Sequence, residues 1–393
     1  MNTQAVVAAL AIVILVSGST SISSLFVSYR AQWGISSADI AIVFSVYVGS
    51  LLPTLVFFGG LAERFGRRRV VTAGVVAMAA GMAILTAAHG LGWLIAARLF
   101  QGVAIGLAAG ALTAALSESY RGKLPIGNVL QAVAAVALFT GPVISAIAFN
   151  LGGGIHLSYV PQFVLVLALF ALVPFLAERV TNPVTAQPVD QPFSPAAVRG
   201  ALRFALPVAF VSWAGLSLFL SLVPAFLANT LHATNPLVGA AAVVAAQLAS
   251  LTVAFALRNI APERAGIGGA VVSIAGLVLL VIGTTMISWP FVILATLLVG
   301  GGCGLASAAS FGIAGRIGRG HRALVFSRWY IAAYAGYSIP ALAIGLIAAH
   351  TSFAFAFSVV TAALAAIVAA LPALRSGQNR HLVAELNFMA CAA

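Results

Sequence analysis

The chain has 393 residues, of which 62% are hydrophobic and only 7% are charged. A soluble domain carries about 25% charged residues, so a water-soluble fold could not hide this much apolar surface and the surrounding solvent must be lipid. The net charge of +12 could indicate a nucleic-acid partner. The charges, however, occur singly or in small groups between apolar runs, and no basic groove is interleaved with aromatic residues. The sequence therefore predicts a membrane protein that binds no nucleic acid.

Apolar runs predict twelve membrane-spanning helices, six on each side of a polar, proline-rich stretch. The first six cover about 5–29, 37–60, 70–88, 91–117, 126–149 and 158–177. The second six cover about 200–228, 235–257, 266–287, 290–315, 323–349 and 352–374. Proline prevents a continuous helix between the halves, which favours an extended linker. We expect an all-α fold of four parts: a six-helix bundle over 1–177, a cytoplasmic linker over 178–199, a second bundle over 200–375, and a disordered cytoplasmic tail over 376–393.

The positions of arginine and lysine orient these helices. If both termini are cytoplasmic, 16 of the 19 basic residues lie on the cytoplasmic side and only Arg30 lies outside. This asymmetry is what the positive-inside rule expects. The N-terminal apolar run lacks the basic segment of a signal peptide, so we retain it as the first helix. With 18 arginines and a single lysine, the composition favours a bacterial inner membrane.

A dense block of charge at 59–69 separates the second and third predicted spans. It reads Gly-Gly-Leu-Ala-Glu-Arg-Phe-Gly-Arg-Arg-Arg. It resembles the loop 2–3 signature of the major facilitator superfamily, Gly-x-Leu-Ala-Asp-Arg-x-Gly-Arg-Arg, with Glu63 in the place of aspartate. The resemblance implies a secondary transporter built from two six-helix bundles. The candidate motif residues are Gly59, Glu63, Arg64, Gly66, Arg67 and Arg68.

Two further residues extend this cytoplasmic motif. Glu118 ends the fourth predicted span and Arg121 follows, as in loop 4–5 of the same family. We expect Glu118 to pair with Arg67 or Arg68 across the cytoplasmic face. Glu63 should approach the start of the eleventh span, where a helix N-terminus favours an anion. Exposed ion pairs contribute less than about 1 kcal/mol, which suits a gate that must open.

Two motifs lie inside predicted spans. Arg98 and Gln101 form an Arg-x-x-Gln-Gly sequence in the fourth span, which resembles a superfamily motif implicated in proton transfer or in shaping the cavity. A buried arginine persists only beside a partner, so a structural role bonded to a neighbouring helix fits equally. Gly141 and Pro142 in the fifth span resemble the core of an antiporter motif, although Gly-Pro can also be a simple kink.

Stripes of serine and aromatic residues predict either a polar, aromatic-rich pocket or interhelical packing. None of the seven acidic residues lies in the middle of a span, and Asp39, near the outer end of the second, is a candidate for the proton pathway. A carrier of cations usually keeps a buried carboxylate, so a neutral, amphiphilic or anionic substrate is expected. The candidate lining residues are Ser17, Ser21, Ser24, Ser28, Trp213, Ser217, Ser221, Gln247, Cys303, Ser307, Tyr330, Tyr334 and Tyr337.

The sequence shows no nucleophile–base pair, metal cluster or phosphate loop, so we expect neither an enzyme nor a metal or other cofactor. The leading hypothesis is a monomeric, proton-coupled exporter of small amphiphilic or hydrophobic compounds, of the drug-efflux type. The alternative is an importer or exporter of a small metabolite, including anionic ones, in which Arg98 contacts the substrate. A third hypothesis is a membrane protein that binds lipid or a partner and transports nothing.

Overall fold

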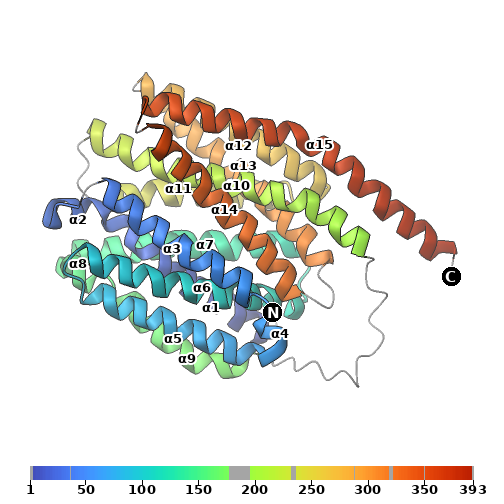
Figure 1. The fold of residues 1–393 in the computed structure, drawn as a ribbon, viewed down its shortest axis with the longest axis horizontal. Helices are drawn as coiled ribbons and strands as arrows, with labels where there is room; N and C mark the ends of the chain where they lie inside the picture. Colours follow the sequence, from blue (N-terminus) through green and yellow to red (C-terminus); the bar gives the residue numbers. More distant parts are fainter. Residues whose placement is uncertain are drawn as a thin grey trace.

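The computed structural model describes residues 3–35, 37–176, 195–231, 236–286, 288–317, 322–348 and 350–391, and its regular structure there is helical (Figure 1). By length and composition, eight of these helical segments could cross a membrane. They are Thr3–Leu25, Arg67–Thr86, Leu91–Ser119, Ile126–Leu157, Val198–Phe219, Pro262–Gly283, Pro290–Ile317 and Phe355–Leu374. Shorter apolar helices cover Ile42–Phe58, Val160–Phe175 and Ala240–Ala256. Within the described residues, a helix lies over each predicted range.

Among its described residues, the first half has nine α-helices and three short turns of other helix types. In chain order these are α1 (Thr3–Thr20), η1 (Ser21–Leu25), α2 (Phe26–Trp33), α3 (Ser37–Phe58), α4 (Leu61–Phe65), α5 (Arg67–Thr86), α6 (Leu91–Ser119), α7 (Ile126–Ala148), η2 (Phe149–Gly153), α8 (Gly154–Leu157), α9 (Val160–Leu172) and η3 (Val173–Phe175). The second half contains α10 (Pro195–Leu231), α11 (Pro236–Ala256), α12 (Pro262–Thr285), α13 (Trp289–Ile317), α14 (Arg322–Ala348) and α15 (Phe353–Cys391). Several helices begin at or next to a proline. Proline suits the first helical turn because the N–H that it lacks would have no intrahelical partner there.

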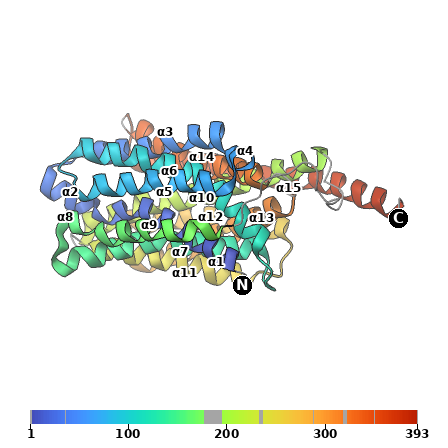
Figure 2. The same ribbon diagram turned by 90° about the horizontal axis from the view of Figure 1, so that it is seen from below.

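The helices of the two halves lie side by side with their long axes roughly parallel (Figures 1 and 2). The halves meet where α7 contacts α11 and α13, and where α14 contacts α3 and α6. The short helix α4 and both ends of the chain lie toward one end of the molecule, whereas α2 and α8 lie at the other (Figure 2). We call the end that carries α4 and the arginine block the basic end.

Two sequence expectations need correction. Residues 178–194 of the predicted linker lie outside the described residues, but α10 already begins at Pro195 rather than at residue 200. The expectation of a disordered tail is wrong as far as Cys391, because α15 continues to that residue. After Gly377 the tail contains no further glycine or proline to interrupt a helix.

The first predicted span is also not one uniform α-helix, since it passes through the 3₁₀ turn η1. Its hydroxyl groups explain the change, because many donate to the carbonyl three residues earlier and so compete with the α-helical pattern. Ser21 Oγ donates to Gly18 O at 2.8 Å and Ser24 Oγ to Ser21 O at 3.3 Å.

Glycines on α6 allow it to approach α3 closely. A Cβ atom added to Gly106 would lie 2.6 Å from Thr54 Cβ, and one added to Gly102 would collide with the Tyr47 carbonyl. Gly-x-x-x-Gly spacing of this kind lets two membrane helices pack backbone to backbone.

We expect Gly106→Ala to destabilise the protein by about 1–3 kcal/mol, because the added methyl group must displace α3. Gly268→Ala is the matched control, since a Cβ there meets no atom within 4 Å and alanine favours a helix over glycine. Thermal unfolding in detergent, followed by circular dichroism, measures both. Equal melting temperatures for the two variants would contradict the packing argument.

Candidate functional site

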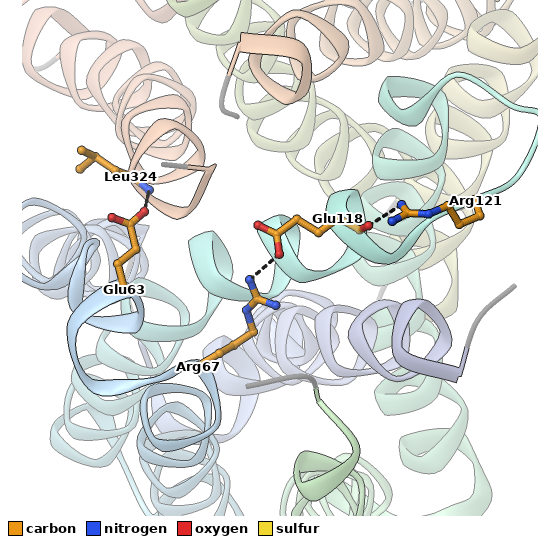
Figure 3. Close-up of polar contacts among 5 residues, drawn as sticks. All are labelled: Glu63, Arg67, Glu118, Arg121 and Leu324. Carbon is orange, nitrogen blue, oxygen red and sulfur yellow. Dashed lines mark hydrogen bonds and ion pairs between the residues drawn. The ribbon is translucent and has the colours of Figure 1, made fainter. Parts of the chain in front are cut away.

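At the basic end, Arg67 and Glu118 form an ion pair inside the first half (Figure 3). Arg67 Nη2 donates to Glu118 Oε2 at 3.0 Å, and the side chains are only 9% and 14% exposed. Arg121 Nη1 donates to the Glu118 carbonyl at 2.6 Å, and Arg68 Nε to the Leu176 carbonyl at 2.7 Å. The predicted pairing with Arg67 is confirmed. The pair joins α5 to α6 within one half, so it cannot by itself hold the two halves together.

Glu63 and Gly59 do reach across to the second half. Leu324 N, in the first turn of α14, donates to Glu63 Oε1 at 3.4 Å (Figure 3). An anion is favoured at this position by the unpaired amides of a helix N-terminus. Ser327 Oγ donates to the Gly59 carbonyl at 3.1 Å, and a Cβ on Gly59 would lie 2.7 Å from Ser327 Cβ. The predicted approach of Glu63 to α14 is therefore confirmed.

The glycine at position 66 has a different reason for its place in the motif. Gly66 joins α4 to α5 with φ 88° and ψ 146°, a conformation that residues with a side chain rarely adopt. The turn brings Glu63, on α4, and Arg67, at the start of α5, to two different partners. Arg64 belongs to the exposed part of the same short helix.

Two amide side chains that sequence reasoning missed also join the halves. Asn128 Nδ2 donates to the Ala254 carbonyl at 2.5 Å, and Gln131 Nε2 donates to Ser250 Oγ at 2.9 Å. Both lie near the start of α7 and are buried. Their polarity at the start of an otherwise apolar helix was the available signal. Gly127 packs beside them against the backbone of α13 at Ala308 and Gly312.

Aromatic and hydroxyl side chains join the halves nearer the centre. Thr113 Oγ1 and Tyr330 Oη are 2.9 Å apart, and Tyr47 Oη donates to Tyr334 Oη at 3.4 Å. The Trp213 ring lies edge-to-face against the Tyr334 ring, with the centroids 5.0 Å apart. The predicted residues Trp213, Tyr330 and Tyr334 are thus brought together by α10 and α14.

Two small cavities lie beside this group. One is bounded by α1, α6 and α7 of the first half and by Trp213, Tyr330 and Tyr334 of the second. The other is lined on α7 by Gln131 and on the second half by polar side chains that include Gln247 and Ser307. In each, about 20 Å³ is open to the centre of a water molecule, which is room for about one water. A larger ligand can enter only if the two halves separate.

Arg98 is buried close to this centre, with 2% of its surface exposed. Its Nη1 donates to the Ser19 carbonyl at 2.6 Å and to Gln101 Oε1 at 3.0 Å. The guanidinium carbon lies 4.9 Å from the Tyr47 ring centroid and 5.4 Å from that of Phe44. These distances fit cation–π contacts, which strengthen when the cation is desolvated. Both predicted residues of the Arg-x-x-Gln motif therefore bond to the kinked first span, since Gln101 Nε2 also donates to Gly18 O at 3.4 Å.

Among the other candidate residues, Cys303 also lines the second cavity. Ser17 Oγ donates to Gln162 Oε1 at 3.2 Å, and Ser21 and Ser24 bond to carbonyls of their own helix. A Cβ on Gly141 would meet the Ser17 carbonyl, so Gly141 and Pro142 belong to the close packing of α7 on α1. Asp39 is half-buried in the first turn of α3, and Ser28 and Ser217 are buried. Cys303 contacts Ser273, Tyr337 lies beside Trp213, and the Ser221 side chain is outside the described residues.

Two histidines far apart in the sequence, His89 and His156, lie next to one another. The His89 and His156 ring centroids are 5.3 Å apart, and His156 Nδ1 lies 3.2 Å from the Thr86 carbonyl. Their separation of 67 residues in sequence hid this pair, which the folding of α5 and α8 against each other creates.

Comparisons with known proteins agree with this architecture. A family model described as "Major Facilitator Superfamily" matches residues 8–269, about two thirds of the chain. Among curated proteins, the riboflavin transporter RibZ of Clostridioides difficile (strain 630) is 28% identical over 158 residues, which cover 39% of this chain and 34% of that protein. The alignment therefore spans about a third of that relative.

We expect Glu63→Lys to open the basic end, because it removes the Leu324 contact and places a cation at the N-terminus of α14. Ser327 is 2% exposed beneath Gly59, so Ser327→Cys in a chain without Cys303 and Cys391 reports the opening. A membrane-impermeant maleimide should react about fivefold faster with this cysteine when Glu63→Lys is present, which corresponds to about 1 kcal/mol.

Glu63→Asp is the matched control, because it keeps the carboxylate that accepts from the helix terminus. It should leave the reaction as slow as in the parent. An unchanged rate in Glu63→Lys would show that this contact does not hold the halves together.

Proposed function

Because this chain belongs to the major facilitator superfamily, we propose that it is a secondary transporter that moves a small organic molecule across a bacterial inner membrane by alternating access. In this proposal twelve spans form two six-helix bundles, over 1–177 and 200–375, joined by a cytoplasmic linker over 178–199. The basic end, both termini and the tail from residue 376 face the cytoplasm, and the protein acts as a monomer.

The observation that carries the proposal is the way the halves meet. Within the described residues, polar contacts across the interface occur at the basic end and near the centre, from Glu63–Leu324 through Gln131–Ser250 to Tyr47–Tyr334. A neutral hydrogen bond contributes about 1 kcal/mol and one to a charged group about 1.5–3 kcal/mol, so a few of them can close one side and still be broken. The structure then corresponds to a state closed toward the cytoplasm.

The surroundings of Arg98 favour a neutral or anionic substrate. The partners described for this buried cation are a carbonyl, an amide oxygen and two aromatic rings. A fixed cation at this depth repels a second one and attracts an acceptor. The name of the relative, a riboflavin transporter, also supports a metabolite rather than a cationic drug. We therefore place transport of a small metabolite first.

Proton-coupled efflux of amphiphilic compounds is the second candidate. It is supported by Gly141 and Pro142 within α7, where the glycine lets α7 lie against the Ser17 carbonyl of α1. This is the helix that also contacts α11 and α13 of the other half. A proton could be carried by Asp39, by a carboxylate at the basic end or along a route that involves Arg98.

A flux assay in liposomes tests the proposal and separates its two forms. We expect vesicles that contain the protein to take up or release riboflavin faster than empty vesicles, and to do so faster still with an imposed pH gradient. Accelerated movement of ethidium with little movement of riboflavin would favour efflux of drugs.

The control for this assay is Gly268→Ala, which changes a glycine with open space around it. If a panel of neutral, anionic and cationic organic solutes moves no faster than through empty vesicles, with or without the gradient, the transporter proposal fails.

A further inference from the structure

Five aromatic residues from both halves gather at the centre of the molecule: Tyr47, Trp213, Tyr330, Tyr334 and Tyr337. We call them the central aromatic cluster. The Trp213 ring lies within 5.0–6.5 Å of the three α14 tyrosine rings, and the Tyr330 and Tyr334 rings are stacked with centroids 6.1 Å apart. From the first half, the Tyr47 ring lies 6.2 Å from that of Tyr334. Three of the five line the first cavity.

Arg98 adjoins the cluster through Tyr47, whose ring lies 4.9 Å from the guanidinium carbon. One of its donors is unused: Nε is buried and has no hydrogen-bond partner. A buried donor of a charged group without an acceptor is costly and rare. Gln162 Nε2 is likewise buried and unpartnered, on a side chain whose Oε1 accepts from Ser17 of the first span. This part of the site therefore has hydrogen-bond donors available for an acceptor that the protein does not supply.

We propose that the centre binds a planar aromatic molecule that carries a hydrogen-bond-accepting oxygen. Its ring stacks on Trp213 and the α14 tyrosines, and its oxygen accepts from Arg98. This inference rests on the proposed transport function and specifies the class of substrate. The shared chemistry is the oxygen acceptor, which a carboxylate or a neutral ring carbonyl can provide.

The packing explains how the site becomes available. In the closed arrangement the cavity has room for about one water, so Tyr47 and Tyr334, which belong to different halves, must move apart first. Their hydroxyl groups are 3.4 Å apart, at the long end of the hydrogen-bond range. When the halves separate, the cluster loses contacts between its aromatic rings. An aromatic ligand can replace these ring–ring contacts better than a saturated ring can.

Binding to the full-length protein in nanodiscs tests separately whether the ligand needs an aromatic ring and whether it needs an oxygen acceptor. The probes are 2-naphthoate, with a ring and a carboxylate; riboflavin, with a fused ring system and neutral carbonyls; cyclohexanecarboxylate, with the acceptor alone; and 2-naphthylmethylammonium, with the ring and a cation. We expect 2-naphthoate or riboflavin, or both, to bind at least tenfold more tightly than the last two. Which of them binds identifies the kind of acceptor.

Two variants with matched controls locate the binding. Trp213→Leu should weaken the aromatic oxygen-bearing probe about tenfold, whereas Trp93→Leu, at a 44% exposed tryptophan outside the cluster, should not. Arg98→Gln should weaken the same probe about tenfold and leave or improve binding of the ammonium probe. Arg258→Gln is its control, because that exposed side chain bonds only to the nearby Phe255 carbonyl. If Arg98→Gln does not fold, Arg98→Lys, which keeps the charge but loses Nε, should show the same selective loss.

The proposal is overturned if cyclohexanecarboxylate or the ammonium probe binds as tightly as the aromatic acceptors, or if the Trp213 and Trp93 variants behave alike. Failure of the transport function is a separate result. If vesicles move a solute but the probes bind without preference, the transport proposal stands and the proposed substrate class is wrong. If vesicles move nothing although 2-naphthoate binds through Trp213 and Arg98, the proposed binding site stands and the transport proposal is wrong.

Discussion

A polar group inside a membrane helix must find its partner within the protein, because the hydrocarbon around it offers none. Arg98 is the most demanding such group described in this chain, and several features of the first half satisfy it. The first span is broken by η1, and the carbonyls of Gly18 and Ser19 just before it bond Gln101 and Arg98. Phe44 and Tyr47 cover the guanidinium from α3. The close approach of α3 to α6 that this requires depends on Gly102 and Gly106.

At the basic end, each motif residue has its own physical role. Gly66 supplies a backbone conformation, Gly59 supplies room for Ser327, and Glu63 supplies an acceptor for the first turn of α14. Arg67 and Glu118 fix the start of α5 against the end of α6 within the first half. Strong internal packing with weak connections between the halves is the condition for a rigid-body rocking motion.

Much of the fold could be predicted from the sequence, because helices that lie in lipid are long and apolar and stand out from the polar segments between them. Helix positions followed from apolar length, and the contacts of Glu63 and Glu118 followed from the motif. Contacts that depend on helix rotation were not accessible: Asn128 and Gln131 bridge the halves, and His89 meets His156. The serines of the first span have helical spacing, but their hydroxyls bond to their own backbone, which a stripe cannot reveal.

In the proposed alternating access, two rigid halves of the chain close first one end of the molecule and then the other. Distances between spin labels at both ends measure this directly, with one pair at Phe65 and Leu324 at the basic end and another at His89 and Met286 at the opposite end, all exposed positions. Alternating access predicts that conditions which lengthen the distance at the basic end shorten the distance at the opposite end. Distances that change together, or that never change with pH gradient or added 2-naphthoate, would contradict it.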